Sequence, residues 1–311
     1  MTSTVADPTP APDPARARLI ATAALIALTA VWGSTFFMIR DLVAVIPSVD
    51  FLAVRFGLAA AVMLAAFWPR VRALPPRELR VGVALGVLYG LAQMLQTEGL
   101  AHTSASVSGF VTGMYVVFTP LLSAALLRER VSPATWGAVA PSAAGLGVLS
   151  LSGLAFGPGE TMTLGAALLY AFHILTLGRT STPANAVALS VVQLAVIAVV
   201  CAVGAIPGGV ALPQTPGQWA VVGYMVVAAS IGAMLVQTWA QAHMSAVRAA
   251  IVMTLEPVFA ALFAVLAGGE SLTWRMLVGG GLIVAAMYVI ELVPARRRGP
   301  PTEALHHEGV A

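Results

Sequence analysis

The chain of 311 residues is 59% hydrophobic and only 9% charged. Soluble domains carry about 25% charged residues, so this composition excludes a water-soluble globular protein. The net charge of +3 comes from 16 arginines and no lysine, and no basic helix stands outside the apolar runs, which excludes a nucleic-acid-binding protein. The single cysteine, Cys201, excludes an internal disulfide, a CxxC redox pair and a thiolate zinc site.

Long apolar runs follow one another along almost the whole chain, so the lipid bilayer is the solvent that suits this sequence. A membrane-spanning helix needs about 20 mostly apolar residues, and ten runs approach that length. The sequence therefore predicts an all-α integral membrane protein with ten transmembrane helices. The runs cover residues 19–39, 51–68, 80–97, 105–127, 134–154, 162–178, 187–206, 219–240, 247–267 and 274–293.

The two ends of the chain have little to bury. Residues 1–18 are rich in proline and hold two aspartates, which predicts a disordered cytoplasmic tail. Residues 294–311, which begin close to three consecutive arginines, predict a second cytoplasmic tail whose basic run can contact anionic headgroups. The first apolar run is too long for a signal peptide, and nine more follow, so we expect it to be a retained helix.

The first two runs each contain a residue with two alternative roles. Trp32 lies in a Trp-Gly-Ser-Thr-Phe stretch and either anchors the helix at the membrane interface or lines a cavity. Arg55 lies about one turn inside the second run, where charges are costly and usually functional. It either reaches outward to pair with Asp41 or Asp50 or faces a substrate.

The third and fourth runs each present a polar face. Tyr89, Gln93 and Gln96 follow one another at i, i+4 and i+7, beside a stripe of Gly82, Gly86 and Gly90 that is typical of helix packing. Hydroxyl groups line one face of the fourth run at Ser104, Ser108, Thr112, Tyr115 and Thr119, and Pro120 follows. Serine and threonine can bond to their own helix, but two aligned polar faces favour a polar cavity.

The second half of the chain repeats the first at an offset of 141 residues. Residues 96–105 and 237–246 share Gln, Thr, Ala, His, Ser and Ala without a gap, and the match continues to Glu129 over Glu270. The repeats are residues 19–154 and 160–293. Because each has five spans, an odd number, the second is expected to enter the membrane inverted, as in many secondary transporters. His102 and His243 would then lie on opposite faces about 30 Å apart, and no metal site is predicted.

The second half adds three candidate residues for substrate binding or coupling. Gln193 corresponds loosely to Arg55, and Gln237 is the counterpart of Gln96. Glu256 lies near the middle of the ninth run and is followed by Pro257, which frees a carbonyl one turn earlier. A carboxylate at that depth needs a partner or a proton. It is either a hydrogen-bonded structural residue or a site of substrate binding and proton coupling. His173 is expected to pack rather than to bind a ligand.

The arginines predict the orientation in the membrane. With ten spans both termini share a side, and placing them in the cytoplasm puts 13 of the 16 arginines on the inner face. Arg40, Arg55 and Arg275 are the exceptions. This bias follows the positive-inside rule. Consistent with inversion, Arg128-Glu129-Arg130 becomes Gly269-Glu270-Ser271 in the second copy, where the loop is expected outside.

These segments resemble the EamA family of the drug/metabolite transporter superfamily. The resemblance is carried by residues 32–36, by Phe118-Thr119-Pro120-Leu121-Leu122 with the Arg-Glu-Arg run, and by Leu255-Glu256-Pro257-Val258-Phe259 with Gly269-Glu270. It covers residues 20–293 and departs from the common pattern only after Glu270, where a basic residue often follows. The resemblance implies a central cavity between inverted halves, lined by the third, fourth, eighth and ninth helices. It also implies alternating access for small metabolites, often in export.

The predicted function is therefore a secondary transporter of the cytoplasmic membrane, with a non-transporting receptor or scaffold as the alternative. An enzyme is not expected, because the sequence has no HExxH, Gly-x-Ser-x-Gly or CxxC motif and no lysine. The expected partners are a small-molecule substrate and the lipid bilayer, without a cofactor or nucleic acid. A proton as coupling ion and a homodimer stay open.

Overall fold

The computed structural model describes residues 14–150 and 157–292, and these residues are helical apart from short connections. The first half contains α1 (Pro14–Val43), α2 (Ser48–Arg72), α3 (Pro76–Leu100), α4 (Ala105–Thr112), α5 (Tyr115–Leu127) and α6 (Pro133–Ser150). The second half contains α7 (Pro158–Thr180), α8 (Ala186–Ala205), η1 (Ile206–Gly208), α9 (Pro216–Tyr224), η2 (Met225–Gly232), α10 (Ala233–Gln241), α11 (Ala246–Met253), α12 (Leu255–Leu266) and α13 (Trp274–Leu292).

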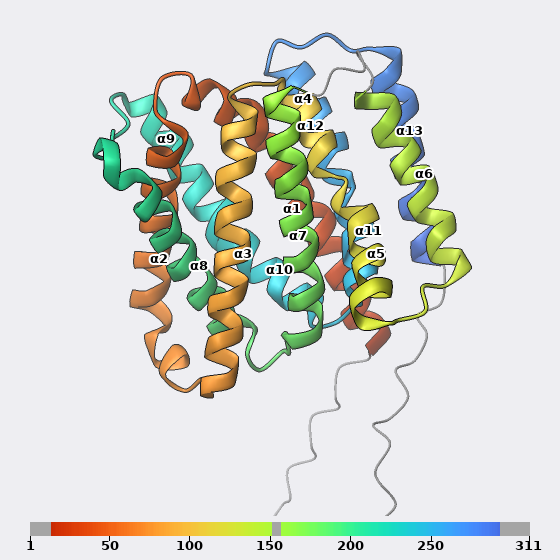
Figure 1. The fold of residues 1–311 in the computed structure, drawn as a ribbon, viewed down its shortest axis with the longest axis horizontal. Helices are drawn as coiled ribbons and strands as arrows, with labels where there is room; N and C mark the ends of the chain where they lie inside the picture. Colours follow the sequence, from red (N-terminus) through yellow and green to blue (C-terminus); the bar gives the residue numbers. More distant parts are fainter. Residues whose placement is uncertain (1–13, 151–156, 293–311) are drawn as a thin grey trace, which may run out of the picture.

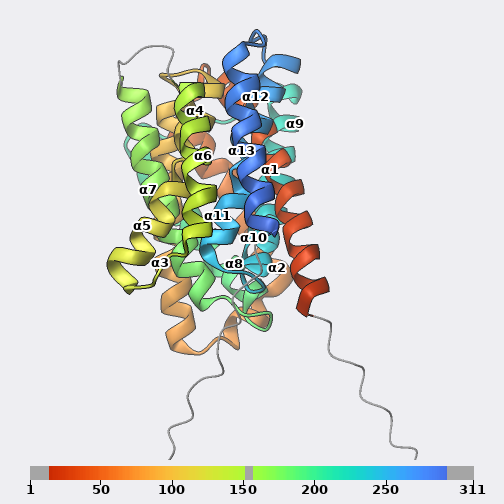
Figure 2. The same cartoon turned by 90° about the vertical axis from the view of Figure 1, so that its right-hand side faces the viewer.

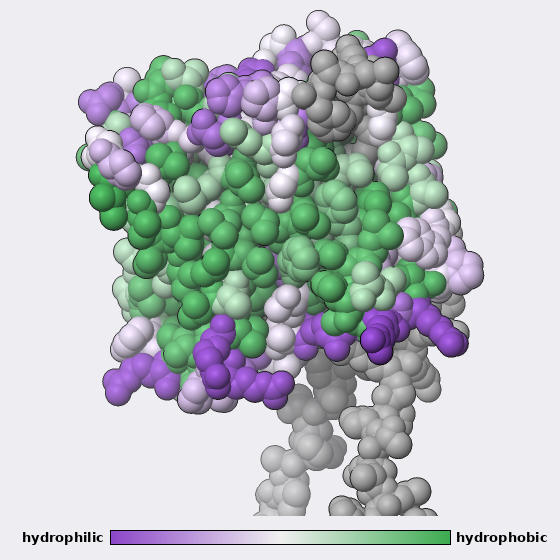
Figure 3. All heavy atoms as spheres, in the orientation of Figure 1, coloured by the Kyte–Doolittle hydropathy of each residue, from purple (hydrophilic) through white to green (hydrophobic). Residues whose placement is uncertain are grey.

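Among the described residues, eight helical segments are long and apolar enough to cross a bilayer. They are Ala15–Val43, Ser48–Arg72, Pro76–Leu100, Ala105–Leu127, Pro158–Thr180, Ala186–Gly208, Pro216–Gln241 and Ala246–Leu266. Figure 3 shows the matching surface, a hydrophobic belt between two hydrophilic rims. Helices satisfy their own backbone groups and can therefore cross hydrocarbon. The protein is a multi-pass membrane protein.

The remaining two predicted spans, 134–154 and 274–293, form α6 and α13 but do not belong to those eight segments. The shorter apolar stretch of α13 is Trp274–Ala286, and the end of the run 134–154 lies outside the described residues. The prediction of a disordered tail over residues 1–18 is wrong for residues 14–18, which belong to α1. The other residues of both predicted tails lie outside the described part of the chain.

The helices of the two halves interlock. Helix α2 packs against α8, α3 against α7 and α8, α1 against α12, and α6 against α13. In Figure 1 the connections after α2 and after α5 lie at the lower end, whereas the connection between α12 and α13 lies at the upper end. Figure 1 shows α6 and α13 at the right-hand edge of the bundle, and Figure 2, turned by 90°, shows them side by side in front. This arrangement surrounds the middle of the bundle with helices from both halves.

The fourth predicted span of each half is broken at the same place. Helix α4 begins at Ala105 and ends at Thr112, and α11 begins at Ala246 and ends at Met253, so both boundaries repeat at the offset of 141 residues. The ninth predicted span breaks at Thr254, just before Pro257. Pro257 has no N–H to donate to the carbonyl of Met253. The expected polar break beside Glu256 is therefore present.

The glycine stripe of α3 is a packing surface, as predicted. An added Cβ at Gly82, Gly86 or Gly90 would lie 2.8, 2.6 or 3.1 Å from the nearest side-chain atom of α8. An added Cβ at Gly145 of α6 would lie 2.6 Å from the carbonyl oxygen of Gly279 in α13. Small residues let helix backbones approach in the membrane. These contacts fix the distance between the halves and so the width of the space between them.

Replacing Gly86 by alanine is expected to lower the unfolding temperature of the detergent-purified protein. Its Cβ would lie 2.6 Å from Cβ of Val196, and overpacking costs about 1–3 kcal/mol. Gly57→Ala is the matched control, because nothing lies within 4 Å of its added Cβ. Both variants gain about 1 kcal/mol of helix propensity, so their difference isolates the clash. Equal unfolding temperatures for the two variants would contradict the packing assignment.

Candidate functional site

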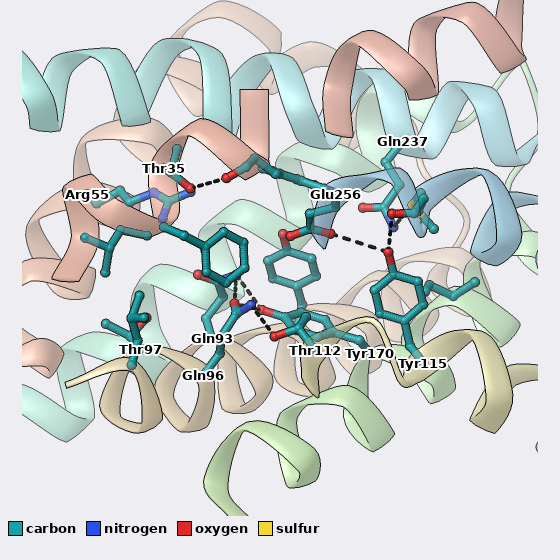
Figure 4. Close-up of a pocket in the computed structure, with 17 residues that line it drawn as sticks. Thr35, Arg55, Gln93, Gln96, Thr97, Thr112, Tyr115, Tyr170, Gln237 and Glu256 are labelled. Atoms are coloured by element: carbon teal, nitrogen blue, oxygen red, sulfur yellow. Dashed lines mark hydrogen bonds between the residues drawn. The ribbon is translucent and has the colours of Figure 1, made fainter. Parts of the chain in front are cut away.

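A cavity lies between the two halves, where side chains from nine helices converge (Figure 4). Its free volume is about 50 Å³, and since a water molecule needs about 10–15 Å³ by this measure, it holds a few waters. The lining residues are Trp32, Thr35, Phe36, Ile39, Arg55, Tyr89, Gln93, Gln96, Thr97, Leu100, Thr112, Tyr115, Tyr170, Ile174, Gln237, Met253 and Glu256.

The structure brings together eight of the nine residues predicted from the sequence. Gln193 is the exception. The eight are Trp32, Arg55, Tyr89, Gln93, Gln96, Tyr115, Gln237 and Glu256. They include two pairs of counterparts at the offset of 141 residues, Gln96 with Gln237 and Tyr115 with Glu256.

Tyr115 and Glu256 meet at the breaks of the two interrupted helices. The Tyr115 hydroxyl donates a hydrogen bond to the carbonyl of Met253 at 2.6 Å, and its oxygen lies 3.4 Å from Oε2 of Glu256. The Met253 carbonyl is the one that Pro257 leaves without a helical donor. A residue of the first half therefore satisfies the backbone break of the second half, beside the buried carboxyl group.

A chain of hydrogen bonds forms one wall of the cavity. Gln93 Nε2 donates to the Tyr170 hydroxyl at 2.5 Å, Tyr170 donates to Gln96 Oε1 at 2.8 Å, and Gln96 Nε2 donates to Thr112 Oγ1 at 3.0 Å. Tyr170 belongs to α7 of the second half, so the chain joins the two halves. The sequence interpretation missed Tyr170. A tyrosine in the middle of an apolar span needs a partner for its hydroxyl, and that signal could have identified it.

Arg55 is held inside the protein and does not reach the surface. It is 2% exposed, and it donates from Nε to Ser230 Oγ at 2.8 Å and from Nη2 to the carbonyl of Ala229 at 2.9 Å. Of the two alternatives for Arg55, the outward pairing with Asp41 or Asp50 is the one that the structure does not show. Asp41 pairs with Arg40, and Asp50 accepts a hydrogen bond from the backbone of Ala211.

The partners of Arg55 come from η2, a π-helical stretch of eight residues. This stretch connects α9 to α10 within the membrane span Pro216–Gln241. Stretches of π-helix shift the backbone hydrogen bonds and are frequent at functional sites. The carbonyl of Ala229 in this stretch also accepts a hydrogen bond from the indole N–H of Trp32 at 3.2 Å. Of the two alternatives for Trp32, the structure shows the cavity-lining one.

Gln193 lies outside the cavity lining. Its Oε1 is 2.7 Å from Nε2 of His173, and its Nε2 donates to the carbonyl of Leu189. The His173 ring packs edge-on against Tyr89, with ring centroids 5.0 Å apart. His173 is therefore the hydrogen-bonded packing residue that the sequence predicts, and Gln193 supports the helices behind the cavity.

Gln237 places an unused hydrogen-bonding atom at the cavity. Its Nε2 lies 3.3 Å from Gln241 Oε1, whereas its own Oε1 is buried and has no hydrogen-bond partner among the residues that the structure describes. Buried polar atoms are nearly always satisfied, and an exception calls for an explanation. A bound solute or water at this wall of the cavity would satisfy it.

The cavity combines one guanidinium, one carboxyl, amide groups and tyrosine hydroxyls with the apolar side chains of Trp32, Phe36, Leu100 and Met253. Ligand sites have this composition, mainly apolar with a few convergent polar groups. In Figure 4, Arg55 lies on the left, Glu256 near the middle, and Tyr115 and Gln237 on the right. Among the described residues no ion pair joins Arg55 to Glu256. The arrangement suits reversible binding of a small polar solute.

Proteins named as transporters are similar to this chain over most of its length. An uncharacterized transporter of Archaeoglobus fulgidus is 27% identical over 276 residues, which cover 88% of this chain and 87% of that protein. YedA of Escherichia coli K12, an uncharacterized inner membrane transporter, is 29% identical over 276 residues, which cover 86% of this chain and 90% of that protein. One crystal structure shares the fold at a TM-score of 0.70 and 20% identity, over 87% of this chain and 96% of that chain.

The profile of the EamA-like transporter family matches residues 19–151 and 157–292. These two segments include every residue that lines the cavity. The match extends well beyond half of the chain and confirms the family that the sequence motifs indicate. The chain belongs to the EamA-like transporter family.

Proposed function

We propose that this protein is a secondary transporter that moves a small metabolite or drug-like solute across the cytoplasmic membrane by alternating access. The observation that carries the proposal is the cavity between the halves, where counterpart residues of both halves, Tyr115 and Glu256, meet. Transporters built from inverted repeats bind substrate near the midplane, at the interface of the repeats and at broken helices. Export is the proposed direction, on the family resemblance alone.

Two similar ion clusters at opposite ends of the molecule support alternation. Glu270, after α12, lies 3.4 Å from Arg40 of α1 and accepts a hydrogen bond from Ser106. Its counterpart Glu129, after α5, lies 2.7 Å from Arg179 of α7 and accepts a hydrogen bond from Ser123. The Glu270 cluster joins α1, the first helix of the first half, to the end of α12 in the second half. The Glu129 cluster joins α7, the first helix of the second half, to the end of α5 in the first half. We propose that the two ends open in turn by breaking these clusters.

The size of the cavity indicates what has to move. A ligand pocket usually measures about 300–1,000 Å³, and this cavity of about 50 Å³ is far smaller. A solute larger than a few water molecules therefore requires the helices to separate. The breaks at residues 113–114 and at Thr254 divide the cavity-lining helices at the level of Tyr115 and Glu256, and we propose them as hinges.

The inverted arrangement predicts that the loops 128–132 and 267–273 face opposite sides of the membrane, with both termini in the cytoplasm. Single cysteines at Ser132 and Ser271, in a Cys201→Ala background, test this in intact cells with a membrane-impermeant maleimide. We expect Ser271→Cys to react from outside and Ser132→Cys to react only after permeabilisation. Reaction of both residues from the same side would exclude the inverted repeat.

Glu256→Gln is expected to remove the response of solute flux to an imposed pH gradient in proteoliposomes. The single hydroxyl proton of Tyr115 is directed to Met253 at 2.6 Å, so a hydrogen bond between Glu256 and the tyrosine oxygen 3.4 Å away requires a proton on Glu256 and a closer approach of the two oxygens. We propose that this protonation is coupled to transport. A glutamine side chain has the size of glutamate and keeps a hydrogen-bond donor, but it cannot take up or release a proton.

The control for this experiment is Glu78→Gln, because Glu78 bonds to Asn185 outside the cavity lining. A panel of metabolites identifies the transported solute before the variants are compared. If Glu256→Gln keeps both the flux and its response to the gradient, Glu256 is structural. If the wild-type protein binds solutes but carries none across the membrane, the receptor or scaffold alternative replaces the proposal.

A further inference from the structure

Arg55 is a buried cation in the cavity wall without an anionic partner. Every carboxylate of the described residues lies beyond ion-pair distance of Arg55. Its hydrogen bonds go to a hydroxyl and a backbone carbonyl, and its guanidinium lies 4.8 Å from the centre of the Phe56 ring. These contacts orient the charge but do not neutralise it. An uncompensated charge inside a membrane protein is costly and usually functional.

The anchoring leaves part of the guanidinium available. Arginine has five N–H donors, and two are used, one on Nε by Ser230 and one on Nη2 by Ala229. The donors on Nη1 and the second donor on Nη2 have no partner among the described residues. These two nitrogens form the fork that binds a carboxylate through two parallel hydrogen bonds. Because η2 fixes the other side of the group, the fork is held in place before a solute arrives.

The opposite side of the cavity offers a complementary contact. Oε1 of Gln237 is buried and has no partner within the described part of the chain, and this residue is 2% exposed. An amide oxygen accepts a hydrogen bond from a hydroxyl or amino group. The side chains of Trp32, Ile39 and Ile174 form apolar walls between these polar groups, which suit a short hydrocarbon body.

We propose that the transported solute is a small organic carboxylate whose carboxylate binds the guanidinium fork of Arg55 and whose hydroxyl or amino group donates a hydrogen bond to Gln237. This inference rests on the proposed transport function and adds the class of substrate. The solute supplies the anionic partner that Arg55 does not have among the described residues, and it occupies the unpartnered acceptor. Arg55 is therefore the residue that selects carboxylates over neutral analogues.

The first test compares acids with their own amides on the purified wild-type protein. The probes are lactate, 3-phenyllactate, alanine and phenylalanine, each beside its primary amide, with inorganic phosphate as a second oxyanion. Binding is measured as the concentration-dependent rise of the unfolding temperature. We expect at least one acid to bind about tenfold or more tightly than its amide, as a charge-assisted bidentate pair requires. Equal effects of acids and amides throughout the panel would overturn the proposal, and so would a response to phosphate alone.

The second test uses variants of the guanidinium site. Arg55→Gln is expected to remove the preference for the acid, and Arg55→Lys to keep part of it, because lysine retains the charge but not the fork. Arg80→Gln is the control, since Arg80 is exposed and bonds to the backbone of Pro76. If Arg55→Gln does not fold, Ser230→Ala, which removes the anchor of Nε, is expected to weaken the preference instead. An unchanged preference in a folded Arg55→Gln protein, or in Ser230→Ala where it replaces that variant, would overturn the assignment.

Flux measurements separate this inference from the function on which it rests. If the protein carries neutral or cationic solutes but no carboxylate, transport stands and the substrate class is wrong. If acids bind in preference to amides but no solute crosses the membrane, the carboxylate site stands and the transport proposal fails. Transport of the acid by the wild-type protein, with loss of the preference in Arg55→Gln, is the result expected from both.

Discussion

A polar group inside a bilayer has to find its partner within the protein, because the hydrocarbon offers none. In this protein the polar groups find their partners in two different ways. Away from the cavity, serine and threonine side chains bond to carbonyls of their own helices, as Thr119 does to Tyr115 and Ser190 to Ala186. At the cavity, Trp32, Arg55, Gln93 and Tyr115 take partners from the other half of the molecule. The polar contacts that satisfy the cavity wall therefore also hold the two halves together.

The helix interruptions supply part of these contacts. The carbonyl of Met253, free because of Pro257, accepts from Tyr115, and the carbonyl of Ala229, in the π-helical stretch, accepts from Trp32 and Arg55. Unsatisfied carbonyls facing lipid would be costly. Both of these point to donors across the interface between the halves. A motion that separates the halves has to break these bonds, and water or solute has to replace them.

Much of the fold could be predicted from the sequence, because hydropathy and length determine which segments enter a bilayer. The ends of the predicted apolar runs lie within a few residues of most helix ends. Helical spacing and the internal repeat also assign the counterpart residues Gln96 and Gln237 to one cavity. Periodicity along one helix does not tell which neighbour a residue will face. That is why Gln193, polar and deeply placed, turned out to contact His173, and why Tyr170, isolated in an apolar run, was missed.

Arg55 shows a second limit. Its depth could be estimated from the sequence, but its partners could not, because they arise from a π-helical stretch about 175 residues away along the chain. Nothing in the residues 225–232 marks that stretch, which has no proline. A change of helical register of this kind depends on the packing around it and becomes visible only in three dimensions.

The contact between Tyr115 and Glu256 bears on the history of the molecule. A residue that touches its own counterpart lies where the two copies of a repeat cross. In a parent built from two identical chains, the same amino acid would have faced itself at this point. Two glutamates there would repel each other or share one proton, and two tyrosines would offer no acid. In this single chain the two counterpart positions hold different residues, so a hydroxyl and a carboxyl group share the centre of the molecule.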